Sequence, residues 1–510
     1  MRIAQALSVA LVGLEATVVE VEVSIGGGLP RTVIVGLPDA ALYEARDRCK
    51  AAITSLDRTW PNQAVTINLT PATLPKAGSH FDLAIVVATL AAERAVPPGQ
   101  LKHTVFLGEL GLDGRVRGVR GVLPALLAAQ RQGCDRAVVP VGQLGEARLV
   151  EGLRVHGVSS LADVLAVLQG RAVSEPDRVD EPAPPQFPRK DLADVVGQLE
   201  GKWALEVAAA GGHHLYLHGP PGVGKTLLAE RLPSILPDLS VAESLEVSAL
   251  HSLAGRPLDG GLVTRPPFAA PHHSASLAAL VGGGARIAQP GAVSHAHCGV
   301  LFLDEAPEFS PRALEALRTP LESGVIVLAR SLAQTTYPAR FQLVLAANPC
   351  PCGLAGTPGA QCRCSPMAVR RYSERISGPI LDRIDIQQGL RPLRQSFLAA
   401  AAGAAEASAA VAARVAAARD RQRHRLAPLS LSLNSAVPGR VLRRELPLPQ
   451  GFERLDRAVS RGLLSARGID KVVRLAWTIA DLAGEPIPTP ADVDTALAMR
   501  RGEQVEARCG

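Results

Sequence analysis

One short segment limits the fold of this chain more than any other. Residues 219–226 read GPPGVGKT, which matches the pattern G-x-x-x-x-G-K-S/T, and they lie between the apolar run Leu215–Leu217 and the helix-forming run Leu227–Glu230. A strand, a glycine-rich turn and a helix N-terminus in this order form a cradle of backbone N–H groups for phosphate oxygens. The pattern therefore predicts a nucleoside triphosphate site, ATP in our interpretation, within an α/β fold. The residues of the expected cradle are Gly219, Pro220, Pro221, Gly222, Val223, Gly224, Lys225 and Thr226.

A second segment completes the expected nucleotide site. Residues 299–305 read GVLFLDE, an apolar strand that ends in two adjacent carboxylates, which is a Walker B pattern. We expect Lys225 to contact the β- and γ-phosphate oxygens, and Thr226 and Asp304 to hold Mg²⁺. The second carboxylate, Glu305, predicts hydrolysis as well as binding, because it can orient and deprotonate the attacking water.

Polar and basic residues after later strands are candidates for contacts with the reacting phosphate. A strand at Phe341–Ala347 ends at Asn348, which we interpret as sensor 1, the polar residue between the two motifs. Arg383 follows in SGPILDRIDI, and Arg467 and Arg474 lie in a later helical run. An arginine from a neighbouring subunit can be worth about 10³ to 10⁵ in rate. By residue type alone, each of the three is more simply interpreted as part of a surface ion pair, so a functional role needs support from a family resemblance.

Length and composition predict a chain of about three domains. It has 510 residues, of which 47% are hydrophobic and 20% charged, and its net charge of +6 permits nucleic-acid binding without requiring it. No apolar run reaches the length of about 18 residues that a membrane span needs. We therefore expect a cytoplasmic protein with no membrane partner.

Changes along the sequence suggest where the domains end. Residues 174–188, SEPDRVDEPAPPQFP, are rich in proline and charge, which is typical of a linker. We predict an α/β domain over residues 1–172, a linker over 173–188, a nucleotide-binding domain over 189–395 and a helical domain over 396–510. In the first domain we expect strands at Ala16–Ser24, Thr32–Gly36 and Ala64–Leu69, and helices at Asp39–Ser55, Phe81–Ala95 and Val122–Gln132; in the last, an alanine-rich helix at Leu398–Arg419 with a basic tail to Arg425.

Several longer segments resemble a known family. FAAPHHSASLAALVGGG, PGAVSHAHCGVLFLDEAPEF, YPARFQLVLAANPCPCG and RYSERISGPILDRIDI are similar, in this order, to the magnesium-chelatase-like AAA+ proteins of the ComM/YifB family. The resemblance covers essentially the whole chain. It implies a central AAA+ P-loop domain with an insertion in its second helix and a C-terminal helical lid domain. It also implies a homo-hexameric ring that drives branch migration of single-stranded or branched DNA during recombination or natural transformation.

The same resemblance assigns roles to individual residues. It implies that Arg383 is the arginine finger that acts on the neighbouring subunit, and that Arg467 is sensor 2, with Arg474 as the alternative. A hairpin is expected near Val325–Tyr337, where Arg330 is the candidate for facing DNA in a central pore. Two other functions stay open: a chaperone-like ATPase that remodels protein complexes, and an ATPase subunit of a magnesium chelatase.

The N-terminal region resembles the proteolytic domain of Lon proteases, a ribosomal protein S5-like fold. The resemblance rests on the Pro75–Ala84 stretch and on the segment Gly108–Gly114, GELGLDG. Lon enzymes use a serine activated by a lysine, but alignment with their pattern puts His80 at the nucleophile position and Leu123 at the lysine position, with Ser79 one place early. Because leucine cannot accept a proton, we expect no proteolysis.

Four of the eight cysteines are close together in the sequence. Cys350 and Cys352, then Cys362 and Cys364, enclose a loop rich in glycine and proline just after Asn348. In a cytoplasmic chain such a group favours structural Zn²⁺ over disulfides, although C-x-C departs from the usual C-x₂-C spacing. Reduced free cysteines and a redox pair are the alternatives.

Other candidate features have simpler interpretations. His272–His273 and His295–Cys298 could suggest a metal, but the family resemblance accounts for them through packing. The arginines of Arg419–Arg425 and those at 440–461 give the C-terminal third a local positive charge, which is most simply a solvated helix face. Because aromatic residues make up only 3% of the chain, we expect any DNA contact to be with phosphates and independent of sequence.

Overall fold

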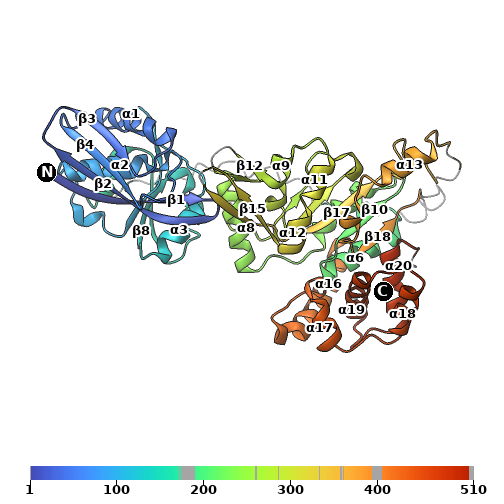
Figure 1. Ribbon diagram of the computed structural model, residues 1–510. Coiled ribbons are helices and arrows are strands. Elements are labelled where there is room, and N and C mark those ends of the chain that lie inside the picture. The colour runs from blue at the N-terminus through green and yellow to red at the C-terminus, as the bar shows by residue number, and fades with distance from the viewer. Residues whose placement is uncertain are drawn as a thin grey trace.

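The computed structural model describes residues 2–171, 173, 190–258, 261–284, 287–331, 333–356, 359, 361–392 and 405–504. These residues form an N-terminal α/β part, a central part around a parallel sheet, and a C-terminal group of helices (Figure 1). The expected linker lies outside the described residues except for residue 173, and so do residues 398–404 of the expected alanine-rich helix. Within the described part of the chain, no helix combines the length and apolar character that crossing a membrane requires.

The N-terminal part is built on a seven-stranded mixed sheet in the order β3-β4-β2-β1-β5-β8-β9. Its long strands β1 (Arg2–Val12) and β2 (Glu15–Gly26) pair antiparallel, and helix α2 (Asp82–Ala92), buried at every residue, packs against both. The strands and helices predicted here are confirmed, with ends that differ by a few residues. The other elements are β3 (Arg31–Val35), β4 (Ala64–Thr70), β5 (Thr104–Phe106), β6 (Glu109–Leu110), β7 (Val116–Arg117), β8 (Arg136–Pro140), β9 (Arg154–Val158), α1 (Ala40–Thr54), α3 (Val122–Arg131), α4 (Leu144–Ala147) and α5 (Leu161–Leu168).

The central part contains a five-stranded parallel sheet in the order β11-β14-β17-β10-β18. Its strands are buried on both faces: Val300 and Phe302 of β14 lie in one core, and Leu301 and Leu303 lie in the other. Such strands read as continuous apolar runs, which is why the sequence predicted them. The strands are β10 (Leu215–His218), β11 (Phe268–Ala269), β14 (Val300–Leu303), β17 (Gln342–Ala347) and β18 (Ile386–Gly389).

Helices and two small hairpins surround this sheet. The hairpin expected near Val325–Tyr337 is confirmed, because β15 (Val325–Ala329) and β16 (Gln334–Pro338) pair antiparallel. A second pair, β12 (Gly282–Gly283) and β13 (Gln289–Pro290), belongs to the segment between β11 and β14. The helices are α6 (Leu199–Gly211), α7 (Lys225–Ala229), α8 (Val241–Leu253), α9 (Leu277–Val281), α10 (Ala292–His295), α11 (Pro311–Glu315), α12 (Arg318–Ser323), α13 (Pro366–Ser373) and α14 (Gly378–Leu381).

The C-terminal helices share a core with the central part. Helices α16 and α19 pack against α6, and Trp477 lies buried in this common core with the Arg425 guanidinium 4.2 Å from the centre of its ring. Arg425 also donates to the Asp481 carboxylate at 2.5 and 2.7 Å. The elements are α16 (Ser408–Leu426), α17 (Gly439–Arg444), α18 (Glu453–Ser460), α19 (Ala466–Ala483) and α20 (Pro490–Arg501).

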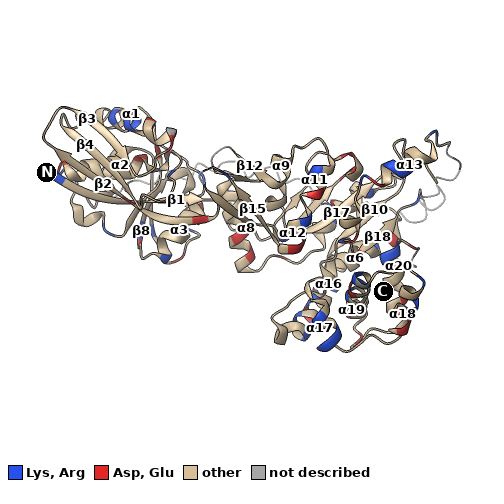
Figure 2. Ribbon diagram, in the orientation of Figure 1, with Lys and Arg blue, Asp and Glu red and all other residues tan. Residues whose placement is uncertain are grey.

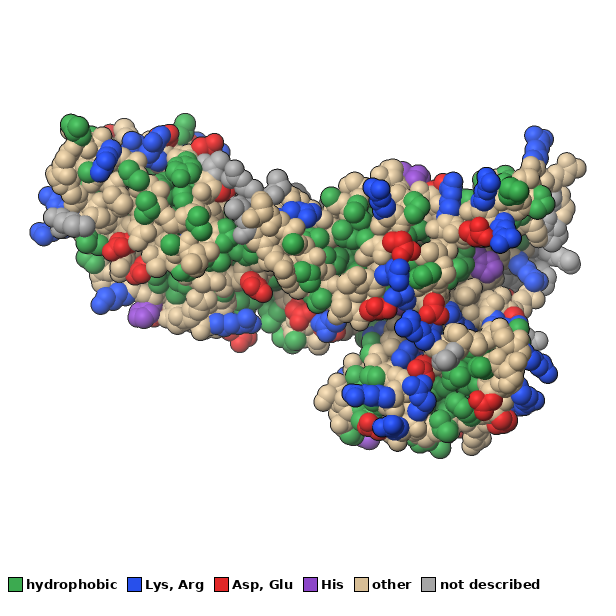
Figure 3. Space-filling model, viewed as in Figure 1, with side chains coloured by type: hydrophobic (Ala, Val, Ile, Leu, Met, Phe, Trp, Pro, Cys, Tyr) green, Lys and Arg blue, Asp and Glu red, His purple; other side chains and the backbone are tan. Residues whose placement is uncertain are grey.

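The basic tail of α16 differs from the solvated face that the sequence suggested. Arg419 donates to the carbonyl of Ala209 at 2.7 and 3.0 Å, and Arg421 donates to the carbonyl of Asp481 at 2.7 Å. With Arg425, these side chains attach α16 to α6 and α19, so they form internal contacts between packed helices. Basic side chains elsewhere in the C-terminal helices remain on the surface, around α17, α18 and α20 (Figures 2 and 3).

The N-terminal part is attached to the central part at helix α8. The backbone N–H of Gly121 donates to the carbonyl of Ser252 at 3.0 Å, and that of Leu123 donates to the Ser252 hydroxyl at 3.3 Å. Leu253 and Tyr337 form an apolar cluster with leucines from the β1–β2 turn region. This contact joins the N-terminal sheet to the base of the β15–β16 hairpin.

Candidate nucleotide site

Strand β10 leads into the phosphate loop, and the loop backbone requires glycine. The φ angles of Gly219, Gly222 and Gly224 are 156°, 77° and 92°, which side chains rarely allow. A Cβ on Gly219 would lie 2.4 Å from the carbonyl oxygen of Leu390. The loop conformation is therefore dictated locally by the sequence, as the motif predicts.

Lys225 and Asn348 meet beside this loop. The Lys225 ammonium donates to the carbonyls of Gly219 and Pro220 at 2.7 and 2.9 Å, and to Oδ1 of Asn348 at 3.0 Å. Burial lowers the pKa of Lys225, while the carboxylates of Asp304 and Glu305 act in the opposite direction. Because Asn348 directly follows β17, the neighbour of β10, the sheet itself brings the two side chains together. Both are in position to share one phosphate group.

Thr226 and Asp304 also lie together. The Thr226 hydroxyl donates to Oδ2 of Asp304 at 2.6 Å, and the backbone N–H of Glu305 donates to Oδ1 at 2.9 Å. A hydroxyl and a carboxylate oxygen are ligands that Mg²⁺ prefers. The donor set therefore fits the predicted magnesium ion.

Glu305 has a backbone conformation that is unusual for a residue other than glycine. Its φ is 50°, in the left-handed region, and its carboxylate lies 3.3 Å from Nδ1 of His273. Strained backbone at a charged site is a common property of functional residues. The sequence gives no signal for the contact with His273, since the two residues come from separate segments and no spacing rule connects them.

The predicted arginines lie at the opposite end of the sheet from the phosphate loop. Arg383 precedes β18 and so lies at the amino ends of the parallel strands, whereas the loop follows the carboxyl end of β10. Arg383 forms an ion pair with Glu322 and donates to the carbonyl of Pro379 at 2.7 Å. Arg467 is exposed and lies 4.0 Å from Asp382. Neither arginine is therefore positioned to contact the phosphate loop of its own chain.

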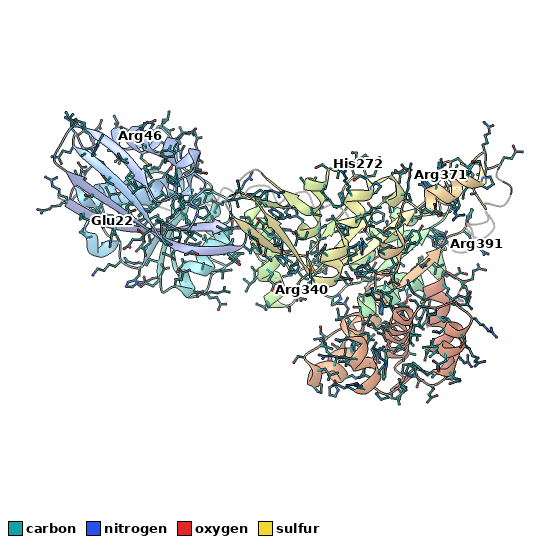
Figure 4. The ribbon with its side chains drawn as sticks, in the orientation of Figure 1. Glu22, Arg46, His272, Arg340, Arg371 and Arg391 are labelled. Atoms are coloured by element: carbon teal, nitrogen blue, oxygen red, sulfur yellow. The ribbon has the colours of Figure 1, made fainter. Side chains whose placement is uncertain are left out.

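The Arg474 side chain is held by a contact within the C-terminal helices. Its Nε donates to the carbonyl of Val437 at 2.8 Å, and burial lowers its pKa. It lines a cavity of about 670 Å³ between the central part and the C-terminal helices, together with Arg383 and Arg340 (Figure 4 labels Arg340 at this edge). Of the two candidates for sensor 2, Arg467 is the one whose side chain is open to contact with another chain.

The four clustered cysteines converge next to the phosphate loop. The Cys350 sulfur lies 3.3 Å from that of Cys352 and 3.8 Å from that of Cys362, and the sulfur of Cys364 completes a group within 4.8 Å. Gly353, inside this turn, approaches so closely that a Cβ there would lie 2.7 Å from Pro221. The four thiols form no disulfide bonds with one another and lie within reach of a single metal ion. The cluster therefore supports both Asn348, two residues earlier, and the phosphate loop.

A second group of polar residues does not suit a metal. His297 Nε2 lies 2.7 Å from the Glu246 carboxylate and 3.2 Å from the Cys298 sulfur. The backbone N–H of Arg340 donates to Nδ1 of the same ring at 3.1 Å, so the ring proton of neutral His297 is on Nε2. A metal at Nε2 would require the opposite arrangement. This group is a hydrogen-bonded contact between α8 and the starts of β14 and β17.

The N-terminal cleft contains the Lon-like residues in a different arrangement. The Ser79 hydroxyl donates to Glu109, and the buried Lys76 ammonium donates to the carbonyl of Pro71. His80 Nε2 contacts the carbonyl of Val9 at 2.7 Å, and burial lowers the pKa of His80 to about 4. Leu123 lies buried at the α3–α8 contact. Ser79, Lys76 and His80 therefore each contact another group, and Ser79 and Lys76 are not paired with each other.

Fold and site together define a class of protein. A five-stranded parallel sheet with a phosphate loop after β10, adjacent carboxylates after β14 and an asparagine after β17 is the arrangement of an AAA+ ATPase. Family models agree: magnesium chelatase subunit ChlI matches residues 191–398, subunit ChlI of Mg-chelatase matches 21–143, and the ChlI C-terminal model matches 405–500. This is a magnesium-chelatase-like AAA+ protein.

Full-length relatives define the family more narrowly. The chain is 51% identical to an uncharacterized protein of Mycobacterium tuberculosis, over 98% of this chain and 99% of that protein. It is 40% identical to the competence protein ComM of Haemophilus influenzae, with 95% of each covered, and 42% identical to the uncharacterized protein YifB of Escherichia coli, with 96% of each covered. The chain belongs to the ComM/YifB family, as its motifs predict. A shorter match, 32% identity over 170 residues, relates it to Lon protease 2 of Bacillus subtilis.

Proposed function

We propose that this chain is the subunit of a hexameric ATPase that moves along DNA and drives branch migration during recombination or natural transformation. The observation that supports the ATPase is the meeting of Lys225 with Asn348, and of Thr226 with Asp304, around one loop. Glu305 adds a carboxylate beside that loop that can accept a proton. The function in DNA transfer draws on the relative named a competence protein.

The proposed reaction transfers the γ-phosphoryl group of ATP to water. The water oxygen bonds to the γ-phosphorus, the bond to the β–γ bridging oxygen breaks, and ADP leaves with that electron pair. Glu305 accepts the proton that the water loses. Lys225 and Asn348 would bind γ-phosphate oxygens. Thr226 and Asp304 would hold Mg²⁺, which would supply positive charge opposite the developing negative charge.

The proposed assembly follows from where the arginines lie. Arg383 and Arg467 are at the amino ends of the strands, so each can act on a phosphate only if that phosphate belongs to a neighbouring subunit. A head-to-tail ring brings the amino end of one sheet against the phosphate loop of the next. In such a ring Arg383 is the arginine finger and Arg467 is sensor 2.

The proposed DNA contacts are independent of sequence. The β15–β16 hairpin presents Arg330 near its tip, and the C-terminal helices carry surface arginines (Figure 3). A motor that moves along arbitrary sequence depends on phosphate contacts rather than on base edges. The binding should therefore weaken steeply as salt concentration rises.

We also propose that the four cysteines hold a structural zinc ion. Zn–S bonds of about 2.3 Å in a tetrahedron place neighbouring sulfurs about 3.8 Å apart. The separations among the sulfurs of Cys350, Cys352 and Cys362 are 3.3, 3.6 and 3.8 Å. The C-x-C spacing of the cluster departs from the usual C-x₂-C spacing, but the distances between its sulfurs are compatible with a tetrahedral zinc site. Its position suggests that the ion fixes the end of β17 rather than taking part in the reaction.

Two measurements test the proposed function. Glu305→Gln should bind a fluorescent ATP analogue like the wild type but release no phosphate; near wild-type turnover would refute the role of Glu305. A three- or four-stranded DNA junction, incubated with wild-type protein and ATP at about 50 mM salt, should be converted to separated products, because electrostatic binding is strong there. An active ATPase that leaves every junction intact, across salts, would favour the chaperone-like or chelatase alternatives.

A further inference from the structure

Helix α13 and the turn before it carry a concentration of positive charge at one end of the central part. Residues 362–375, CRCSPMAVRRYSER, contain four arginines and a single carboxylate, Glu374. Figure 2 shows basic residues on α13, and Figure 4 labels Arg371 there. The four arginines, all of them exposed, are Arg363, Arg370, Arg371 and Arg375. None of the contacts described above for the nucleotide site involves them, so this charge needs a separate explanation.

One of the four arginines attaches α13 to the central part. Arg375 lies 2.9 Å from the Glu308 carboxylate, and its guanidinium carbon lies 5.7 Å from the centre of the Tyr372 ring, which is buried. The helix begins just after Cys364, whose sulfur belongs to the cysteine cluster. The helix is thus held at its start by the cluster and at its end by Tyr372 and Arg375, so its outward face has a defined position.

The outward face of α13 combines positive charge with one apolar side chain. Met367 is three and four residues before Arg370 and Arg371, which places the three on one side of the helix. Met367 is 63% exposed. Arg370 lies 2.7 Å from the Glu374 carboxylate, but an exposed pair of this kind contributes little and exchanges readily. Arg371 forms no ion pair with any residue that the structure describes. We call Arg363, Met367, Arg370 and Arg371 the α13 surface.

The α13 surface suits the backbone of duplex DNA better than it suits a single strand. The forked N–H groups of arginine match phosphate oxygens, and methionine is among the apolar side chains that contact duplex DNA beside arginines. Single strands are usually bound where exposed aromatic rings stack on the bases. The only aromatic residue of α13, Tyr372, is buried. A protein partner would require a larger apolar centre than one methionine.

We propose that the α13 surface binds duplex DNA, with Arg371 as its main phosphate contact. The inference rests on the proposed function, because it takes branched DNA as the substrate. The β15–β16 hairpin lies where the central part meets the N-terminal part, whereas α13 lies at the other end of the central part (Figure 1). The two contacts are therefore separate: the α13 surface holds a duplex arm of the junction, and Arg330 of the hairpin contacts the strand that is moved.

The test is binding of labelled DNA by the full-length chain with a slowly hydrolysed ATP analogue, measured by fluorescence anisotropy at several salt concentrations. Arg371→Ala should weaken binding of a short duplex about fivefold to tenfold at about 0.1 M salt, because each neutralised phosphate adds about 0.9 to the slope of log affinity against log salt. Arg370→Ala combined with Arg371→Ala should lower that slope by about two. Binding of a single strand of the same sequence should be unchanged.

Two further variants control for charge and for folding. Arg371→Lys retains the positive charge and should keep most of the salt slope, although it loses the forked geometry. Arg131→Ala is the matched control, because Arg131 is an exposed arginine in the last turn of α3, far along the chain from α13. It removes the same charge and should bind duplex DNA like the wild type. Each variant should also keep the wild-type melting temperature and the wild-type ATPase rate without DNA.

The outcomes separate this inference from the proposed function. If the wild type binds and moves junctions while the double variant keeps wild-type affinity for the duplex, the motor stands and the α13 surface is refuted as a DNA site. An equal loss of affinity in Arg131→Ala would also refute it, since net charge alone would then explain the effect. A wild-type chain that binds neither duplex, single-stranded nor branched DNA would contradict the proposed function and this inference together.

Discussion

Two buried lysines in this chain make instructive opposites. Lys225 in the central part and Lys76 in the N-terminal part are both almost fully covered, and burial lowers the pKa of both. Lys225 donates to the carbonyls of its own loop and to Asn348. The carboxylates of Asp304 and Glu305 raise its pKa against the effect of burial. Lys76 donates to the carbonyl of Pro71, which is not a serine hydroxyl.

The difference shows what separates a reactive site from a fold that resembles one. Around Lys225, side chains from three neighbouring strand ends converge where a ligand can replace internal hydrogen bonds. Around Lys76, Ser79 and His80 are each satisfied by a nearby group, and the cleft of about 420 Å³ beside them is partly walled by Leu253 and Tyr337 of the central part. The same residue type, a buried lysine, therefore belongs to a ligand site in the central part and to an internal hydrogen bond in the N-terminal part.

The sharpest test replaces each lysine by alanine. Lys225→Ala should lose detectable ATP binding and hydrolysis, because the cation opposite the β- and γ-phosphates is gone. Lys76→Ala should retain both if it folds, which its melting temperature will establish first. Titration with a fluorescent ATP analogue and a phosphate-release assay measure these outcomes. Loss of nucleotide binding in a folded Lys76→Ala would contradict the comparison.

The next largest effect is expected from Arg383. Arg383→Ala should lower turnover by about 10³-fold or more while ATP binding persists, because an arginine finger acts on the transition state. Mixing Arg383→Ala with Lys225→Ala subunits should recover activity at roughly a quarter of the sites, by random pairing in a ring. No recovery in mixed assemblies would show that Arg383 acts within its own chain or not at all.

The cysteine cluster should have an intermediate effect. Cys350→Ser should reduce zinc from about one ion per chain to below about 0.2, since structural zinc binds tightly. Turnover should drop by about tenfold to 100-fold, because displacements of about 1 Å at positioning groups cost about that much. Cys134→Ser, far from the cluster in the N-terminal part, is the control. Wild-type protein without zinc by elemental analysis would refute the metal.

The smallest effect is expected in the N-terminal cleft. Ser79→Ala should change ATP turnover by less than about twofold, since surface substitutions away from a site have small effects. Fluorescent casein should stay intact with either protein in the presence of ATP. Cleavage by the wild type that Ser79→Ala abolishes would restore the protease interpretation.

The sequence allowed prediction of features that are locally determined. Gly219, Gly222 and Gly224 need positive φ, so the phosphate loop could be identified from its own residues, and the apolar runs before Asp304 and Asn348 identified buried parallel strands. The sequence predicted Asn348 as sensor 1 between the two motifs, but its hydrogen bond with Lys225 is seen only in the structure.

Features that depend on distant segments could not be predicted. The contact of His273 with Glu305 needs the turn before α9 to fold over the end of β14. The internal bonds of Arg419 and Arg425 need α6 and α19 beside α16, and a basic run has the same appearance in sequence whether it faces solvent or a helix. The burial of Arg474 has the same cause.

The attachment of the N-terminal part to α8 affects how the two parts stay together. Hydrogen bonds from Gly121 and Leu123 to Ser252, together with the apolar cluster around Tyr337, join the parts through a packed surface. The covalent connection between residues 171 and 190 then contributes mainly a high effective concentration of one part near the other. If the chain were cut in that connection, its two pieces should remain associated at concentrations above the dissociation constant of the α3–α8 contact.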